Sequence, residues 1–112
     1  MLVNFFGGVS ITEELVSLYG YVKGSTYRRK VMEVLRNKTF LTPTDIASSS
    51  GIRVNHISKI LKDLKDKDLI YCANEELRKG RMYTLSHLGL DVCNFYCEME
   101  GTVFDFGDGD GE

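Results

Sequence analysis

The most regular pattern of apolar and polar positions lies between Ile52 and Leu69, in the stretch IRVNHISKILKDLKDKDL. Apolar side chains recur there at every third or fourth position. At about 100° per residue they fall within an arc roughly 120° wide, which is typical of the core-facing side of an amphipathic helix. The pattern therefore predicts a helix over about residues 54–67. Its expected core-facing residues are Val54, Ile57, Ile60 or Leu61, and Leu64.

A shorter helix is predicted just before this one. The sequence TPTD at 42–45 supplies a capping threonine, a proline at the first helical position and an acid where a capping box places one. About two turns later, SSSG at 48–51 ends the helix, because glycine adopts the left-handed backbone conformation without steric cost. A short helix, a turn with glycine and a longer amphipathic helix form the pattern of a helix-turn-helix, whose second helix reads DNA.

A β-hairpin is predicted directly after the second helix. The runs Leu69–Ala73 and Arg81–Leu85 are short and mostly apolar, with turn residues between them, so they predict two strands. A hairpin in this place would be a wing, and basic residues on a wing can reach the minor groove or flanking phosphates. The basic residues of this loop are Arg78, Lys79 and Arg81. Glu75 and Glu76 lie on the same loop and weaken its positive field.

Two further helices are predicted on the N-terminal side. Thr12 is the expected N-cap of the first, and Ser25 is that of the second, which runs to about Arg36. The second helix should bury Tyr27, Val31, Val34 and Leu35. Residues 1–10 are expected to form a flexible or loosely docked arm.

A last helix should begin after Ser86 and end near Met99. Its apolar side and that of the first helix have no partner inside a minimal DNA-binding unit, so we expect the two helices to pack against each other or against a second subunit. The expected dimer-interface residues are Leu15, Leu18, Tyr19, Leu88, Val92, Phe95, Tyr96 and Met99.

The predicted fold is α+β and mostly helical: a winged helix-turn-helix with a three-helix core, a β-hairpin wing and extra N- and C-terminal helices. The expected organisation is an N-terminal arm and helix over 1–22, a DNA-binding unit over 23–85, a C-terminal helix over 86–100 and an acidic, disordered tail over 101–112.

The charges are segregated along the chain. All 14 Lys and Arg residues lie between Lys23 and Arg81 with only 7 of the 16 acids, whereas residues 82–112 hold 7 acids and no Lys or Arg. The formal net charge of −2 hides this division. Association follows the local field more than the net charge, so a basic middle segment remains compatible with nucleic-acid binding.

Other sequence features argue against several classes of protein. Three cysteines make no disulfide framework and favour a reducing, cytoplasmic compartment. There is no basic leader and no uncharged run of about 20 residues, so neither a signal peptide nor a membrane span is expected. Motifs of phosphate-binding loops, nucleophilic enzymes and zinc hydrolases are missing, so we expect no enzyme and no cofactor.

A metal- or redox-responsive regulator stays open as an alternative. Cys93 and Cys97 are four residues apart, His87 lies six residues before Cys93, and Cys72 belongs to the hairpin. Two thiolates at this spacing can share Zn²⁺, but they are too few for a structural site unless a second subunit supplies more ligands. Small apolar cysteines on the buried side of a helix are the favoured interpretation, and no metal site is expected.

Three stretches resemble a known family. DLKDKDLI at the end of the reader helix and GRMYTLSHLG at the end of the hairpin are similar to MarR/ArsR-type winged-helix transcription regulators, and LYGYVKGSTYRRKVMEVL resembles small archaeal members in particular. The resemblance covers about Leu15 to Cys97. It implies dimerisation through terminal helices and a reader helix in the major groove. Arg53 departs from the small hydroxyl cap that is common in the family, and the acidic tail is no part of the family pattern.

The resemblance also implies a set of DNA-binding residues. They are Thr44 on the first helix of the motif; Arg53, Asn55, His56, Ser58, Lys59 and Lys62 on the reader helix; and Arg78, Lys79 and Arg81 on the wing. Arg28 and Arg29 are candidate phosphate contacts, because cations at a helix start oppose the helix dipole and a DNA phosphate would offset that cost.

The sequence thus predicts a regulator that binds double-stranded DNA in a sequence-specific manner as a homodimer. Affinity would come from Lys and Arg contacts to phosphate, and specificity from Asn55, Ser58 and Lys59 at base edges. The alternative is a winged helix that binds another protein instead of DNA, which the net charge of −2 and the two loop glutamates favour slightly.

Overall fold

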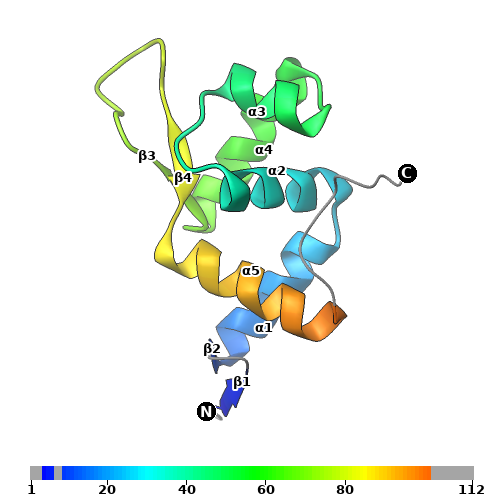
Figure 1. Ribbon diagram of the computed structural model, residues 1–112. Coiled ribbons are helices and arrows are strands. Elements are labelled where there is room, and N and C mark those ends of the chain that lie inside the picture. Colours follow the sequence, from blue (N-terminus) through cyan, green and yellow to red (C-terminus); the bar gives the residue numbers. More distant parts are fainter. Residues whose placement is uncertain (1–3, 7–8, 102–112) are drawn as a thin grey trace.

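The computed structural model describes residues 4–6 and 9–101. Within these residues the chain forms five helices and two antiparallel hairpins, so the prediction of a mostly helical α+β chain is confirmed (Figure 1). The helices are α1 (Glu13–Lys23), α2 (Thr26–Asn37), α3 (Pro43–Ser50), α4 (Val54–Asp66) and α5 (His87–Glu100). The strands are β1 (Asn4–Phe6), β2 (Val9–Ile11), β3 (Ile70–Cys72) and β4 (Tyr83–Leu85).

The predicted helix starts are correct because their signals are local. Thr12, Ser25, Thr42 and Ser86 each accept a hydrogen bond from the backbone N–H three residues later, at the starts of α1, α2, α3 and α5. Gly51 ends α3 in the left-handed conformation, with φ of 76°. Glycine at this position lets the chain turn within three residues from α3 into α4.

Helix α4 is amphipathic, as predicted. Ile57 and Leu64 are completely buried. The sequence predicted that either Ile60 or Leu61 would face the core, and in the structure both are buried. Val54 was expected in the core but is 51% exposed, and Tyr27 in α2 is likewise 43% exposed. Both residues stand in the first turn of their helix, and the buried side begins about one turn later.

Helix α2 connects the two parts of the core. It contacts α1 and α5 on one side and α3, α4 and β4 on the other, as its central place in Figure 1 shows. Val31, Met32 and Leu35 are its most deeply buried apolar side chains. A core that runs through α2 therefore fixes α3 and α4 relative to the terminal helices.

Helices α1 and α5 pack against each other within the single chain, which is one of the two arrangements that the sequence left open. The Tyr19 ring meets Phe95 and Tyr96 edge-on, with centroid distances of 5.3 and 5.5 Å. The Tyr19 hydroxyl donates a hydrogen bond to Glu100, and Lys23 Nζ lies 2.7 Å from Glu100 Oε2. These contacts hold the C-terminal ends of the two helices together.

This packing corrects most of the predicted dimer interface. Five of its residues are buried by the chain's own core and present no surface to a second subunit: Leu15, Leu18, Val92, Phe95 and Tyr96. Tyr19 and Leu88 are partly buried against the same core, and Met99 alone among the eight is largely exposed, at 50%. The apolar spacing of α1 and α5 correctly indicated two helix faces that must be covered. In the structure these faces cover each other within one chain.

Strands β3 and β4 pair in antiparallel register, with Ile70 opposite Leu85 and Cys72 opposite Tyr83. Leu41 forms an isolated bridge to Tyr83 through two backbone hydrogen bonds of 2.8 and 3.0 Å. The paired strands are shorter than predicted, so the segment between them is a ten-residue loop over 73–82 that extends away from the helices in Figure 1. We call this segment the hairpin loop.

The N-terminal segment differs from the expected flexible arm. Strands β1 and β2 pair in antiparallel fashion, with Asn4 opposite Ile11 and Phe6 opposite Val9, and β2 contacts α5. Two short apolar runs around Gly7-Gly8 are a hairpin signal that the sequence interpretation did not use. The predicted disordered tail, apart from Gly101, lies outside the described residues. Among the described residues, every helix falls short of the length and apolar character that crossing a bilayer requires.

Candidate nucleic-acid interface

The structure brings the predicted reader residues together on the outward side of α4 and the turn before it. All six are exposed: Arg53, Asn55, His56, Ser58, Lys59 and Lys62. Within the helix they alternate with the buried apolar residues, so burial of one side of α4 forces the polar side outward. Thr44 is also exposed, in the first turn of the neighbouring helix α3.

The start of α4 differs from the other helix starts. Arg53 occupies the N-cap position without a side-chain cap, as the sequence led us to expect, and the first turn of α4 contains no acid. The turn closes on the Arg53 carbonyl, which accepts a hydrogen bond from His56 N at 2.9 Å. A helix start with an exposed arginine and no competing carboxylate is favourable for an anion.

The C-terminal half of the outward side is electrostatically balanced. Lys59 Nζ lies 3.4 Å from Asp63 Oδ2, and Lys62 Nζ lies 3.1 Å from Asp66 Oδ2. Exposed pairs of this kind contribute only about 0.3–0.5 kcal/mol each. The lysines are therefore restrained weakly enough for another anion to displace the carboxylates.

One hollow, of about 260 Å³, lies between α4 and the start of α2. The ring centroids of Tyr27 and His56, which both line this hollow, are 5.8 Å apart. Arg28 lines the hollow together with Asn55, so the structure brings this predicted phosphate contact to the α4 surface. Its guanidinium is already engaged, because it stacks 3.8 Å from the Tyr21 ring centre and donates a hydrogen bond of 2.8 Å to the Tyr21 carbonyl.

Arg29, the other predicted phosphate contact, is directed elsewhere. Its Nη2 donates a hydrogen bond of 2.9 Å to Thr26 Oγ1. The pKa of the Glu100 carboxyl is lowered, first by the hydrogen bond from Lys23 and then by that from Tyr19, with a smaller contribution from the charge of Arg29. Arg29 thus acts toward α5 and does not join the α4 surface.

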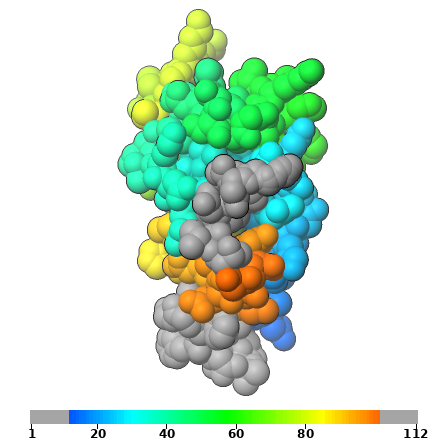
Figure 2. Space-filling view, turned by 45° about the vertical axis from the view of Figure 1, so that its right-hand side comes forward, coloured from blue at the N-terminus to red at the C-terminus, as the bar shows by residue number. Residues whose placement is uncertain are grey.

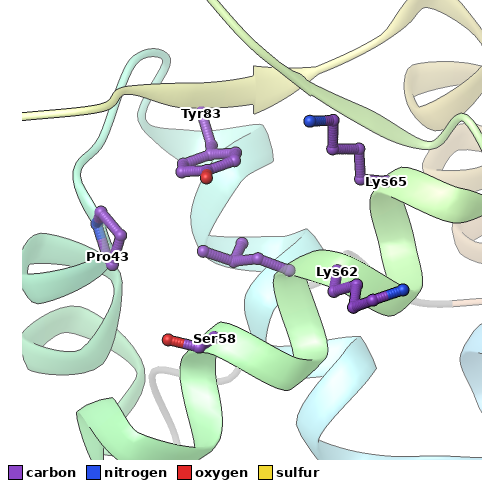
Figure 3. Close-up of a pocket in the computed structure, with 6 residues that line it drawn as sticks. Pro43, Ser58, Lys62, Lys65 and Tyr83 are labelled. Carbon is purple, nitrogen blue, oxygen red and sulfur yellow. The ribbon is translucent and has the colours of Figure 1, made fainter. Parts of the chain in front are cut away.

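A second hollow, of about 200 Å³, lies between α4, α3 and β4. In Figure 3 the Tyr83 side chain hangs from β4 into it, and the Ser58 hydroxyl points toward Pro43. Lys65 extends from α4 toward the hairpin, whereas Lys62 points away. The predicted reader residues Ser58 and Lys62 therefore border a depression that separates α4 from α3 and the hairpin.

The hairpin loop presents two of its three predicted DNA-binding residues. Arg78 and Lys79 are exposed at its tip. Arg81 is turned inward: its Nε donates a hydrogen bond to the Leu77 carbonyl, and its Nη2 donates one of 2.9 Å to the Glu75 carbonyl. Arg81 is half-buried, and its guanidinium supplies carbonyls of the loop with donors, so its role as a DNA contact stays a prediction.

Lys65 and Glu75 form a link that the sequence analysis missed. Lys65 Nζ of α4 lies 2.6 Å from Glu75 Oε2 of the hairpin loop. This hydrogen bond is the main cause that raises the pKa of Lys65 and lowers the pKa of Glu75. The two residues are ten positions apart, and only the path of the loop brings them together, so no local spacing could have indicated the pair.

The cysteines give the metal or redox alternative no support. Burial raises the pKa of Cys93 to about 12, so its thiol is protonated at neutral pH and is a poor metal ligand. Within the described part of the chain, no group of three or more His, Cys, Asp or Glu side chains is arranged to hold a metal ion.

The α3–α4 surface and the hairpin loop lie at the same end of the molecule. Figure 2 shows the loop, in yellow-green, projecting beside the green α3–α4 region, with orange α5 farther toward the opposite end. Comparison with known proteins adds no relative, since the sequence matches no protein-family model and a search of the curated proteins finds no match.

Proposed function

We propose that this protein is a winged-helix transcription regulator that binds double-stranded DNA in a sequence-specific manner as a homodimer. In this proposal α3 and α4 form the helix-turn-helix, α4 enters the major groove, and the hairpin loop is the wing beside the minor groove or the flanking phosphates. The observation that carries the proposal is the outward side of α4, where every predicted reader residue is exposed while the opposite side is buried.

The chemistry of the exposed side chains suits base recognition. The Asn55 amide can bond to both N6 and N7 of adenine, Lys59 can donate to guanine, and Ser58 can pair with either base edge. Each good contact contributes about 1–3 kcal/mol of discrimination. Arg53, beside the uncapped start of α4, would contact phosphate and fix the orientation of the helix.

The homodimer requires an interface other than the one inferred from apolar spacing. Exposed apolar side chains remain on both terminal helices: Val16 on α1 is 47% exposed, and Leu90 and Met99 on α5 are 42% and 50% exposed. A two-fold dimer would place its two α4 helices about 34 Å apart, one turn of DNA. A palindromic target with that spacing would be the sign of such a dimer.

The experiment is selection of bound sequences from a random duplex library, followed by fluorescence anisotropy titration of the selected duplex. We expect affinity to fall as salt rises, with a slope of about 0.9 per phosphate contact on logarithmic axes. A matched pair of variants locates the surface. Lys62→Gln on the outward side should weaken binding and reduce the slope by about 1 per protomer. Lys67→Gln should have a smaller effect, because Lys67 is the C-cap of α4, beyond the last reader residue of the helix.

A protein-binding winged helix is the second candidate function. The specific observation in its favour is that Lys59, Lys62 and Lys65 are each paired with an acid, which weakens the positive field along α4. A folded chain that binds no duplex DNA at low salt, or that binds without salt dependence, would refute the DNA proposal and favour this candidate.

A further inference from the structure

The side chains of Asn74 and Arg81 form hydrogen bonds to backbone atoms within the hairpin loop. Asn74 Nδ2 donates a hydrogen bond of 3.1 Å to the Gly80 carbonyl, and Asn74 Oδ1 accepts one of 2.8 Å from Met82 N. Arg81 bonds to two further carbonyls of the loop, those of Glu75 and Leu77. These bonds close the two halves of the loop on each other, so it behaves as one compact unit.

The Lys65–Glu75 ion pair joins this unit to α4. Both side chains are substantially exposed, at 43% and 56%, so the pair contributes little to the stability of the fold. Its geometric effect is larger. In Figure 3 Lys65 rises from the last turns of α4 toward the hairpin, and the bond of 2.6 Å ends on the segment that Arg81 also holds. The distance between α4 and the loop tip is thereby restrained.

A carboxylate close to a phosphate-binding tip would normally weaken DNA binding through its charge. The loop carries two adjacent glutamates, and only Glu75 reaches a cation: among the described residues, no ion pair joins Glu76. Two neighbouring carboxylates thus have different structural roles. Glu75 restrains the loop, whereas Glu76 contributes negative charge alone.

We propose that Lys65 and Glu75 are positioning residues that hold Arg78 and Lys79 at a fixed offset from α4, so that all of these groups meet one duplex together. This inference rests on the proposed function. It adds that the wing is ordered before DNA arrives, which avoids the entropy cost of ordering ten loop residues on binding.

The test compares Glu75→Ala with Glu76→Ala, which remove the same charge from neighbouring positions. Glu76→Ala should tighten binding to the selected duplex by a few-fold and leave the salt slope unchanged or slightly steeper. Glu75→Ala should bind up to about fivefold more weakly than Glu76→Ala, because a restraint worth at most about 1 kcal/mol is lost. Its salt slope should fall below that of Glu76→Ala, because Arg78 and Lys79 contact phosphate less often. Equal shifts for the two variants would overturn the proposal.

A second measurement separates positioning from charge. The double substitution Arg78→Gln with Lys79→Gln should cost much less affinity in the Glu75→Ala background than in the wild-type chain. In that background the phosphate contacts of Arg78 and Lys79 are already weakened, so the two effects are not additive. Equal costs in both backgrounds would overturn the proposal. The exchanged pair Lys65→Glu with Glu75→Lys should recover most of the wild-type affinity, and continued weak binding by this variant would also count against it.

Failure of the proposed function is recognised separately. If the wild-type chain binds no duplex DNA, the DNA assignment fails whatever the loop variants do. Amide hydrogen exchange of residues 73–82 then tests the restraint alone. Glu75→Ala should accelerate exchange there relative to Glu76→Ala, and equal exchange in the two variants would show that the ion pair does not restrain the loop.

Discussion

Gly89 should tolerate no side chain, although it lies inside a helix where alanine is normally better. It belongs to the first turn of α5, which crosses the turn between α4 and β3. A Cβ built at Gly89 would lie 2.1 Å from the Leu69 carbonyl oxygen and 3.2 Å from Leu85 Cδ2, whereas ordinary contacts begin at 3.4 Å. The nearest atom is backbone, so rotation of a side chain cannot relieve the overlap.

The expected cost of Gly89→Ala follows from two opposing effects. Overpacking of a well-packed core costs typically about 1–3 kcal/mol, and a backbone collision places this variant at or above the upper end. Replacing glycine by alanine within a helix returns about 1 kcal/mol. We therefore expect a net loss of about 2 kcal/mol, which corresponds to a fall in melting temperature of about 8 °C for a domain of this size.

Denaturant unfolding followed by circular dichroism measures this loss, and Gly20→Ala is the matched control. Gly20 lies in the interior of α1, and a Cβ there would meet nothing within 4 Å. The control should therefore gain about 0.5–1 kcal/mol. If the free energy of unfolding of Gly89→Ala equals that of the control, α5 does not approach the Leu69 backbone as closely as the structure shows.

Three further predictions concern the site and the terminal helices. Asn55→Ala should lower the discrimination between selected and scrambled duplexes by about 1–3 kcal/mol while non-specific affinity is kept; equal losses on both duplexes would remove Asn55 from base recognition. Asp63→Asn should tighten DNA binding about twofold at low salt, because Lys59 is released from a pair of about 0.3–0.5 kcal/mol; weaker binding in the anisotropy titration would contradict this. Glu100→Gln should destabilise the chain at neutral pH. The hydrogen bond from Lys23 lowers the folded-state pKa of Glu100, so the ionised carboxylate stabilises the fold above its unfolded pKa and this contribution is lost as pH falls through the folded value. The stability difference between wild type and Glu100→Gln should shrink steadily as pH falls below the unfolded pKa of a glutamate, and a difference that does not change with pH would refute the ionic origin.

The sequence predicted those parts of the fold that depend on neighbouring residues. Threonine and serine caps, the glycine at position 51 and the periodic burial of α4 are all local signals, and each appears where it was expected. The outward side of α4 followed from the same periodicity, because burial of Ile57 and Leu64 leaves Asn55 and Lys59 no other direction.

Features that depend on the path of the chain could not be predicted in this way. The family resemblance pointed to Arg81, but the bonds that its guanidinium makes within the loop depend on which carbonyls the loop leaves unpaired. Apolar spacing in α1 and α5 showed that Leu18 and Val92 must be covered, without showing whether the cover is the same chain or a second one. The Lys65–Glu75 link required knowledge of where the loop returns toward α4.

The deep burial of Cys93 has a practical consequence. Burial raises the pKa of the Cys93 thiol to about 12, so the thiol is protonated at pH 8, and its residue has no exposed surface. Alkylating reagents react with accessible thiolates, so they should label the partly exposed Cys97 readily and reach Cys93 only during a transient opening of the core. Cys72 is buried as well, at 8% exposure, so the rate of modification must be followed at Cys93 itself. That rate would report how often the core around α5 opens, without an engineered probe.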